Sequence, residues 1–142
     1  MNTKRWSVLF GILACTMLAL SVKAEEEAKK PSKKGTVIFY RIRSAKGGAI
    51  RLNITGGDSG TVGILTNGSK IVKELPVGEF TFVVTSPSIA GRDSVIIKVE
   101  EGKTYYVKGS TKLGWPAARS RFTLMDEIKG KAESDKIKEP KT

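Results

Sequence analysis

Apolar and polar residues alternate along most of the chain between residues 35 and 128. A period of two places successive side chains on opposite faces of a β-strand, whereas a helix buries residues that lie three and four apart. Ile50, Leu52 and Ile54 show the pattern clearly, because all three point to one face of the run AIRLNIT. No stretch has a convincing helical face, and the pattern therefore predicts an all-β body.

About eight short runs of this kind follow one another, with turn residues between most pairs. They are TVIFYRI, AIRLNIT, TVGILT, SKIVKEL, EFTFVVT, DSVIIKVE, KTYYVKG and RSRFTLMD. Asn67-Gly68 is a strong hairpin signal because both residues tolerate a positive φ. In LPVG, Pro76 presets φ for the first corner of a turn and Gly78 closes it, so that Phe82 points to the apolar face of the next strand. These features predict one small antiparallel β-sandwich of about seven or eight strands.

The first 24 residues follow a different pattern. Lys4 and Arg5 precede an apolar run that ends near Leu20, and small residues, Val22 and Ala24, occupy the two positions that a signal peptidase reads. The apolar run is too short for a membrane span of about 20 residues. Residues 1–24 are therefore predicted to be a secretory signal peptide that is cleaved after Ala24.

Cys15 offers an alternative reading of this segment. Residues 12–15, ILAC, resemble a bacterial lipobox, in which the cysteine is lipidated and becomes the first mature residue. The apolar run continues beyond Cys15, which favours cleavage after Ala24. That cleavage would leave a mature chain without cysteine, and hence without a disulfide.

Charged segments flank the predicted body. Residues 25–34 hold three acids and four lysines, and residues 129–142 hold five lysines and three acids with almost nothing apolar. Segments of this composition bury too little apolar surface to fold. We therefore expect a charged linker at 25–34 and a disordered, lysine-rich tail at 129–142. The mature chain would keep 22 of the 25 basic residues and all 14 acidic residues, a net charge of +8.

The composition also limits the chemistry of the chain. There is no histidine, and Cys15 is the single cysteine. Signal cleavage would leave no proton shuttle of the usual kind, no ligand set for zinc and no thiol nucleophile. The adjacent acids Glu100-Glu101 and Asp126-Glu127 point to opposite faces of a strand and cannot act together on one bond. We expect a protein that is not an enzyme, has no metal or cofactor and binds no nucleic acid; a weak hydrolase is an alternative.

Five segments occur in an order that resembles a known bacterial family. They are an opening strand TVIFYR, a hairpin LTNGS, the runs LPVGEFTF and VEEGKTYYV, and a closing strand that ends in MDE. In this order they resemble the family named domain of unknown function 2846, over residues 35–128. The resemblance implies a small exported envelope protein, a predicted lipoprotein in many members, with a prealbumin-like or PEGA-like β-sandwich. It implies no catalytic residues, and the weak lipobox at Cys15 departs from many members.

Two pairs of arginines are candidates for an anion-binding face. Arg41 and Arg43 lie two residues apart on one predicted strand, so both side chains project from the same face. Arg119 and Arg121 do the same on another. If the first and last strands are neighbours, the four guanidinium groups gather, with Arg51 near them. Their planar forks suit phosphate or carboxylate. The alternative is a solvated sheet face that discourages edge pairing.

Trp115 lies in the predicted loop GWP. Beside basic residues, an exposed tryptophan stacks on a sugar or lies at a membrane interface. The alternative is that it folds back over the open end of the sandwich.

These observations predict a domain over residues 35–128 that serves as a binding or structural accessory of the bacterial cell envelope, in the periplasm or anchored through Cys15. Its partner would be an anionic envelope lipid or glycan. The alternative is a periplasmic adaptor that binds another envelope protein.

Overall fold

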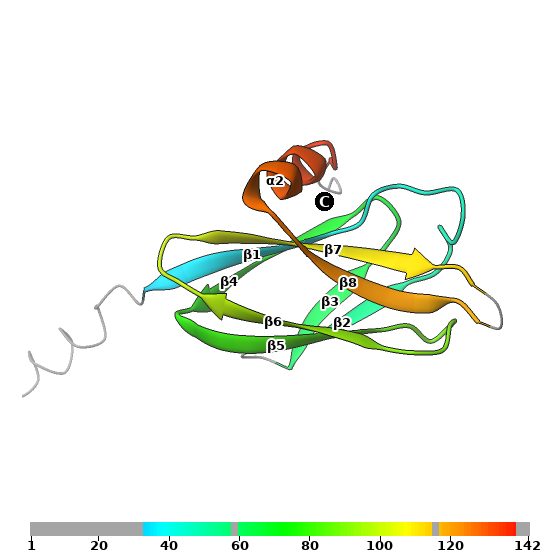
Figure 1. Cartoon of the computed structure of the whole chain (residues 1–142), viewed down its shortest axis with the longest axis horizontal. Coiled ribbons are helices and arrows are strands. Elements are labelled where there is room, and N and C mark those ends of the chain that lie inside the picture. The colour runs from blue at the N-terminus through cyan, green and yellow to red at the C-terminus, as the bar shows by residue number, and fades with distance from the viewer. Residues whose placement is uncertain (1–32, 58–59, 115–116, 139–142) are drawn as a thin grey trace, which may run out of the picture. The chain divides into compact units, whose positions relative to one another are not determined.

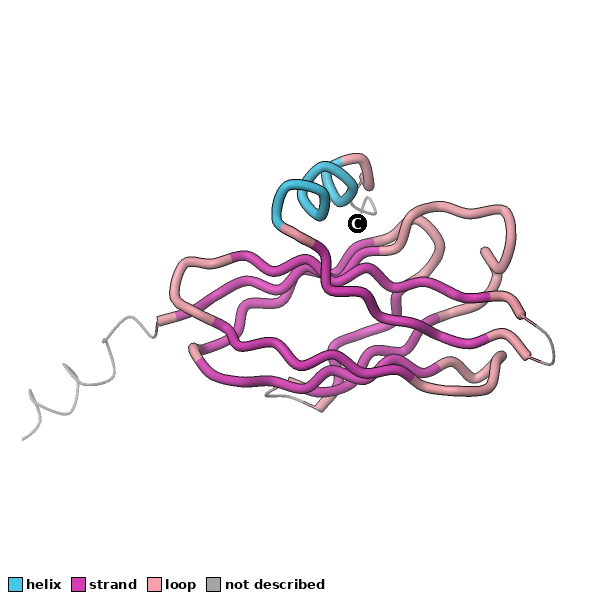
Figure 2. The backbone as a smooth tube through the Cα atoms, in the orientation of Figure 1, coloured by secondary structure: helices cyan, strands magenta, loops and turns pink. Residues whose placement is uncertain are grey.

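The computed structural model describes residues 33–57, 60–114 and 117–138. These residues form eight strands and one helix, and the strands lie in two layers (Figures 1 and 2). The strands are β1 (Lys34–Tyr40), β2 (Leu52–Gly56), β3 (Thr61–Leu65), β4 (Lys70–Pro76), β5 (Gly78–Thr85), β6 (Asp93–Val99), β7 (Thr104–Lys112) and β8 (Arg119–Met125). The predicted all-β sandwich is confirmed.

Each layer is a sheet of four strands. The first sheet has the order β4-β1-β7-β8 and the second has the order β3-β2-β5-β6. All pairs are antiparallel except β1 with β7, which are parallel. The predicted antiparallel sandwich is confirmed at every pair except this one, which lies in the middle of the first sheet.

The core lies between the two sheets and follows the period-two pattern. Phe39 and Phe82 face each other from opposite sheets with ring centroids 4.9 Å apart in an edge-to-face arrangement, and neither is exposed. Phe122 on β8 packs against Phe39 at 5.8 Å. The buried aliphatic residues of this core are Val37, Leu52, Ile54, Leu65, Leu75, Val84, Ile97, Val99 and Val107.

The strand directions bring four connections to one end of the sandwich. Because β1 and β7 are parallel and their neighbours run oppositely, both strands end where β4 and β8 begin. In the other sheet, β3 and β5 end where β2 and β6 begin. The β1–β2, β3–β4, β5–β6 and β7–β8 connections therefore share an end, which we call the loop end (at the right in Figure 1).

The segment expected to be a disordered tail is in part a helix. Helix α2 (Glu127–Asp135) covers the outer face of the first sheet, as Figure 1 shows. Asp126 caps it, because a carboxylate oxygen accepts a hydrogen bond from the Lys129 backbone N–H at 2.9 Å. The prediction of disorder is wrong for residues 129–138, and residues 139–142 lie outside the described part of the chain.

Helix α2 packs through small residues rather than through a large apolar stripe. Its buried residues are Gly130 and Ser134, and Ile137 follows the helix and packs with Tyr40 and Tyr106. The low apolar content of residues 129–142 is the reason that composition predicted disorder there. The predicted linker also ends earlier than expected, since β1 already includes Lys34.

Candidate functional site at the loop end

The structure divides the predicted arginine cluster. Strand β7 lies between β1 and β8, so the first and last strands are not neighbours. Strand β1 also ends at Tyr40, before the first arginine pair begins. The prediction that five arginines gather on one face is therefore wrong. Arg119 and Arg121 do lie on one strand and remain exposed on the same face of β8.

Arg41 has a structural position. It is 3 % exposed, and its guanidinium donates hydrogen bonds to the carbonyl oxygens of Ile50 and, at 2.6 Å, Gly47. Burial lowers the pKa of Arg41 from its ordinary value. These bonds fold residues 41–51 into a fixed loop, and Arg41 is not accessible to a ligand.

The same loop is fixed to the β3–β4 hairpin. Asn67 accepts a hydrogen bond from the Ser44 backbone N–H at 2.8 Å and returns one to the Ser44 carbonyl at 3.0 Å. Arg43 lies over Gly68. Any other residue at position 68 would place its Cβ 3.3 Å from the Cβ of Arg43. Arg43 and Arg51 are both exposed, and Arg43 faces a cavity of about 640 Å³ beside Ile137.

A second cavity, of about 430 Å³, lies between the start of β6, the end of β7 and the start of β8. We call it the basic cavity, and the residues that line it include Arg92, Asp93, Lys112, Arg119, Ser120 and Arg121. Within the described residues, none of its four cations forms an ion pair. Sequence reasoning identified Arg119 and Arg121 but not the other four residues.

The one acid of this cavity is engaged with the backbone. One carboxylate oxygen of Asp93 accepts the Phe122 N–H at 2.9 Å, and the other accepts the Ser94 N–H at 3.0 Å. Asp93 thereby joins the edge strands β6 and β8 of the two sheets. Within the described residues none of the four cations is paired with Asp93, whose carboxylate keeps its negative charge beside them.

Charge is distributed unequally between the two ends of the sandwich. The loop end, with the strand residues that flank it, consists of residues 41–51, 66–69, 86–93, 112–114 and 117–121. These residues include eight basic side chains and one acidic side chain, Asp93. The opposite end has four basic and four acidic residues, counted over residues 33–35, 74–79 and 98–103. Some of these pair, as Lys33 does with Glu101 at 3.4 Å. The excess positive charge of the described domain is therefore concentrated at the loop end.

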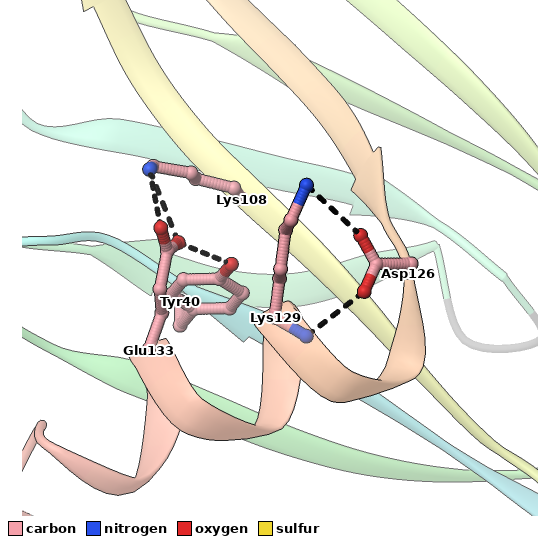
Figure 3. A network of polar contacts seen from close by, with 5 residues as sticks. All are labelled: Tyr40, Lys108, Asp126, Lys129 and Glu133. Atoms are coloured by element: carbon pink, nitrogen blue, oxygen red, sulfur yellow. Dashed lines mark hydrogen bonds and ion pairs between the residues drawn. The ribbon is translucent and has the colours of Figure 1, made fainter.

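A polar network joins α2 to the first sheet (Figure 3). The Tyr40 hydroxyl donates to one carboxylate oxygen of Glu133 at 2.7 Å, and the Lys108 ammonium donates to the other at 3.2 Å. Burial and the hydrogen bond to Glu133 raise the pKa of Tyr40 far above its ordinary value. The hydrogen bond from Tyr40, with Lys108 beside it, lowers the pKa of Glu133. Tyr40 therefore stays neutral, and the network attaches the helix rather than providing a catalytic base.

Several predicted features lie outside the described residues. They are the signal peptide over residues 1–24, Cys15 within it, residues 25–32 of the linker, and Trp115. In the part of the chain that is described, no helix combines the length and apolar content that a bilayer span requires. Comparison of the chain with models of protein families, with curated proteins and with solved structures finds no match.

Proposed function

We propose that this chain is an exported, non-enzymatic accessory of the bacterial cell envelope whose loop end binds an anionic lipid surface. Two features of the sequence support the location: the signal-peptide pattern of residues 1–24, and the resemblance of residues 35–128 to the family of domain of unknown function 2846. The charge distribution of the fold supports the ligand.

The observation that carries the proposal is the separation of charge along the sandwich. Eight basic residues and one acid occupy the loop end, whereas the opposite end is balanced. A basic side chain close to an anionic membrane contributes about 1 kcal/mol of attraction, so that several on one end give measurable affinity. A sandwich with this distribution orients its loop end toward the anionic surface before contact.

Exposed apolar side chains at the same end favour a lipid surface over a soluble glycan. Ile42 is 39 % exposed in the β1–β2 connection, and Leu113 is 51 % exposed just after β7. Both lie among the basic residues of the loop end. Cations combined with aliphatic side chains suit the boundary between headgroups and acyl chains, where the former meet phosphate and the latter leave water.

Vesicle sedimentation tests the proposal with variants of equal charge. The mature chain, starting at Glu25, should bind vesicles of phosphatidylglycerol and phosphatidylethanolamine, bind phosphatidylcholine vesicles poorly, and be released by salt. Changing Arg43, Lys46 and Arg51 to glutamine should weaken binding by about tenfold or more. Changing Lys34, Lys98 and Lys103 at the opposite end removes the same charge and should have little effect.

Other outcomes distinguish the alternatives. Equal losses from the two sets of variants would show that bulk basicity, and not the loop end, determines binding. Binding to an acidic glycan without binding to vesicles would contradict the lipid assignment. Recovery of one stoichiometric envelope protein in place of vesicle binding would favour the adaptor, and turnover of an envelope substrate would contradict a non-enzymatic role.

A further inference from the structure

Asn67 joins two connections of the loop end through its side-chain amide. The amide oxygen accepts the Ser44 N–H at 2.8 Å, and the amide nitrogen donates to the Ser44 carbonyl at 3.0 Å. Gly48 lies beside the same amide, because a Cβ added at Gly48 would be 2.7 Å from the Asn67 nitrogen. The amide therefore holds the β1–β2 connection on the β3–β4 hairpin. A carboxylate, which accepts hydrogen bonds but donates none, could not make both contacts.

The residue after Asn67 exposes this amide to a chemical reaction. Gly68 has a φ of +73°, which side-chain-bearing residues rarely adopt, so the turn itself requires a glycine here. A glycine has no side chain that hinders its backbone nitrogen. Among the described residues, no hydrogen bond engages the Gly68 N–H, and the turn is closed by the Ser69 N–H, which donates to the Thr66 carbonyl at 3.2 Å. The Gly68 nitrogen is therefore an unhindered nucleophile next to the Asn67 amide.

We propose that Asn67 is a site of deamidation and that its contacts with Ser44 determine the rate. Asparagine is among the least durable residues chemically. The Gly68 nitrogen forms a bond to Cγ of Asn67, the bond from Cγ to the amide nitrogen breaks, and the proton of the Gly68 nitrogen leaves with that nitrogen as ammonia. Water then opens the resulting ring at either of its two carbonyl carbons, which gives aspartate or isoaspartate. Water is the only co-reactant.

The contacts with Ser44 slow the reaction because ring closure disrupts them. Cγ has to come within bonding distance of the Gly68 nitrogen, which takes the Asn67 side chain out of a staggered rotamer. The amide nitrogen has to give up its bond to the Ser44 carbonyl before it can leave. Both changes occur in molecules in which the β1–β2 connection has moved away from the hairpin. The rate of deamidation should therefore follow the population of this open form.

The product cannot restore the contact with the Ser44 carbonyl. A carboxylate at position 67 has no hydrogen to donate to it, and isoaspartate also adds one carbon atom to the backbone of the turn. The new charge lies in the loop end, next to the Gly68 over which Arg43 packs. The loop end would then have two acidic residues against eight basic ones. Resting on the proposed function, deamidation weakens the hold of the domain on an anionic surface.

Peptide mapping by mass spectrometry measures the reaction in the mature chain. From Glu25 onward the chain has no glutamine and one other asparagine, Asn53, which precedes the branched and hindering Ile54. In mildly alkaline buffer, Asn67 should be converted and Asn53 should not. Conversion should be faster when urea unfolds the chain. No conversion of Asn67 in the unfolded chain, or equal rates in the folded and unfolded chains, would overturn the inference.

Two glycine variants test the role of the contacts with Ser44. Gly48→Ala places a methyl group 2.7 Å from the Asn67 amide nitrogen and 2.8 Å from the Ser44 carbonyl oxygen, so it should force the contact open. Gly114→Ala is the matched control, since a Cβ there meets no atom within 4 Å. In the folded chain, Gly48→Ala should accelerate conversion of Asn67 by about tenfold or more. Gly114→Ala should leave the rate unchanged, and equal rates in the two variants would contradict the role of Ser44.

Asn67→Asp reproduces one product and separates this inference from the proposed function. Amide hydrogen exchange of residues 41–51 should become faster in this variant, with or without vesicles. Binding to phosphatidylglycerol vesicles should weaken by about fivefold, whereas Val77→Asp, which adds the same charge at the opposite end, should bind as the unaltered chain does. Faster exchange in a chain that binds no vesicles would overturn the proposed function and leave the deamidation site standing. Unchanged exchange in a chain that binds vesicles would do the reverse.

Discussion

Phe82 occupies the centre of the core, where β5 faces β1 across the two sheets. The side chain has no exposed surface, and its ring packs against the edge of Phe39. Phe82→Ala should lower the free energy of unfolding by about 3–5 kcal/mol, since it removes apolar contact and leaves a cavity. Denaturant unfolding measures this loss. Phe80→Ala, at a partly exposed position on the same strand, should cost less, and equal stability of Phe82→Ala and the unaltered chain would contradict this core assignment.

Glu133 should make the stability of the domain depend on pH. Its pKa is lower in the folded chain than the ordinary value of about 4.3 because Tyr40 and Lys108 stabilise the carboxylate. A lowered pKa contributes stability that is fully present above the unfolded value and is lost as pH falls through the folded value. Glu133→Gln should therefore cost about 1 kcal/mol at pH 7, a modest figure because the side chain is 29 % exposed.

The difference between Glu133→Gln and the unaltered chain should begin to shrink below the ordinary carboxyl pKa of about 4.3 and disappear once the pH falls below the lower pKa of the folded chain, as protonation removes the charge from the native side chain. Thermal melts over a series of pH values measure it. Asp135→Asn serves as the control, because Asp135 forms only an exposed ion pair with Lys131. A constant difference down to acidic pH would show that the charge of Glu133 contributes nothing.

At single residues, the sequence predicted burial better than it predicted charge. The apolar alternation placed Phe82 on the core face, because burial of apolar side chains follows from the period of the strand alone. Arg41 fits the same alternation and was placed on an exposed face. Its actual position depends on the carbonyl groups of Gly47 and Ile50, which only the folded loop brings within reach.

Among the elements, the close packing of α2 on the first sheet depends on Gly130. A Cβ added at Gly130 would clash with the Cβ of Tyr106, far inside van der Waals contact. Alanine is ordinarily better than glycine inside a helix by about 1 kcal/mol. Gly130→Ala should nevertheless destabilise the domain, by about 1–3 kcal/mol, because the clash pushes the helix away from the sheet.

Thermal unfolding and the near-ultraviolet circular dichroism of the tyrosines report this displacement. Ala132→Gly, on the exposed side of α2, gives the comparison, since it should cost only the helix propensity of about 1 kcal/mol. An increase in melting temperature for Gly130→Ala would show that α2 does not pack closely on Tyr106.

The strands could be read from the sequence and the helix could not. A strand in a two-layer sandwich buries one face, which leaves an alternation of apolar residues in the sequence. Helix α2 docks through Gly130 and Ser134, and it is attached through the contact of Glu133 with Tyr40 and Lys108. Contacts made by small and polar residues leave no apolar period, so composition alone suggested a disordered tail.

For the molecule as a whole, the loop end should approach an anionic membrane while the opposite end stays in water. The chain from Glu25 has no cysteine, so single cysteines can be introduced for labelling. Leu113 and Val77 lie at opposite ends and are about equally exposed, at 51 % and 50 %. An environment-sensitive fluorophore on Leu113→Cys should shift to the blue on anionic vesicles, and the same fluorophore on Val77→Cys should not. A larger shift at position 77 would reverse the proposed orientation.

The net charge could be counted from the sequence, but its placement could not. Arg92 and Lys112 are far apart in the chain and lie in different predicted strands or turns, with no signal that joins them to Arg119. They meet because the parallel pairing of β1 and β7 brings the β5–β6 and β7–β8 connections to one end. The antiparallel sandwich expected from the sequence did not include the parallel pairing of β1 with β7.

The central position of β1 also determines how much of the chain must be synthesised before the first sheet can form. Strand β1 is synthesised first, yet its neighbour β7 begins at Thr104, which pairs with Thr36. Contacts that close so long a stretch of chain form slowly. A nascent chain therefore has no finished first sheet until most of the domain has been made. For a protein that we propose to be exported, this order of synthesis leaves the first sheet incomplete until β7 and β8 have left the ribosome.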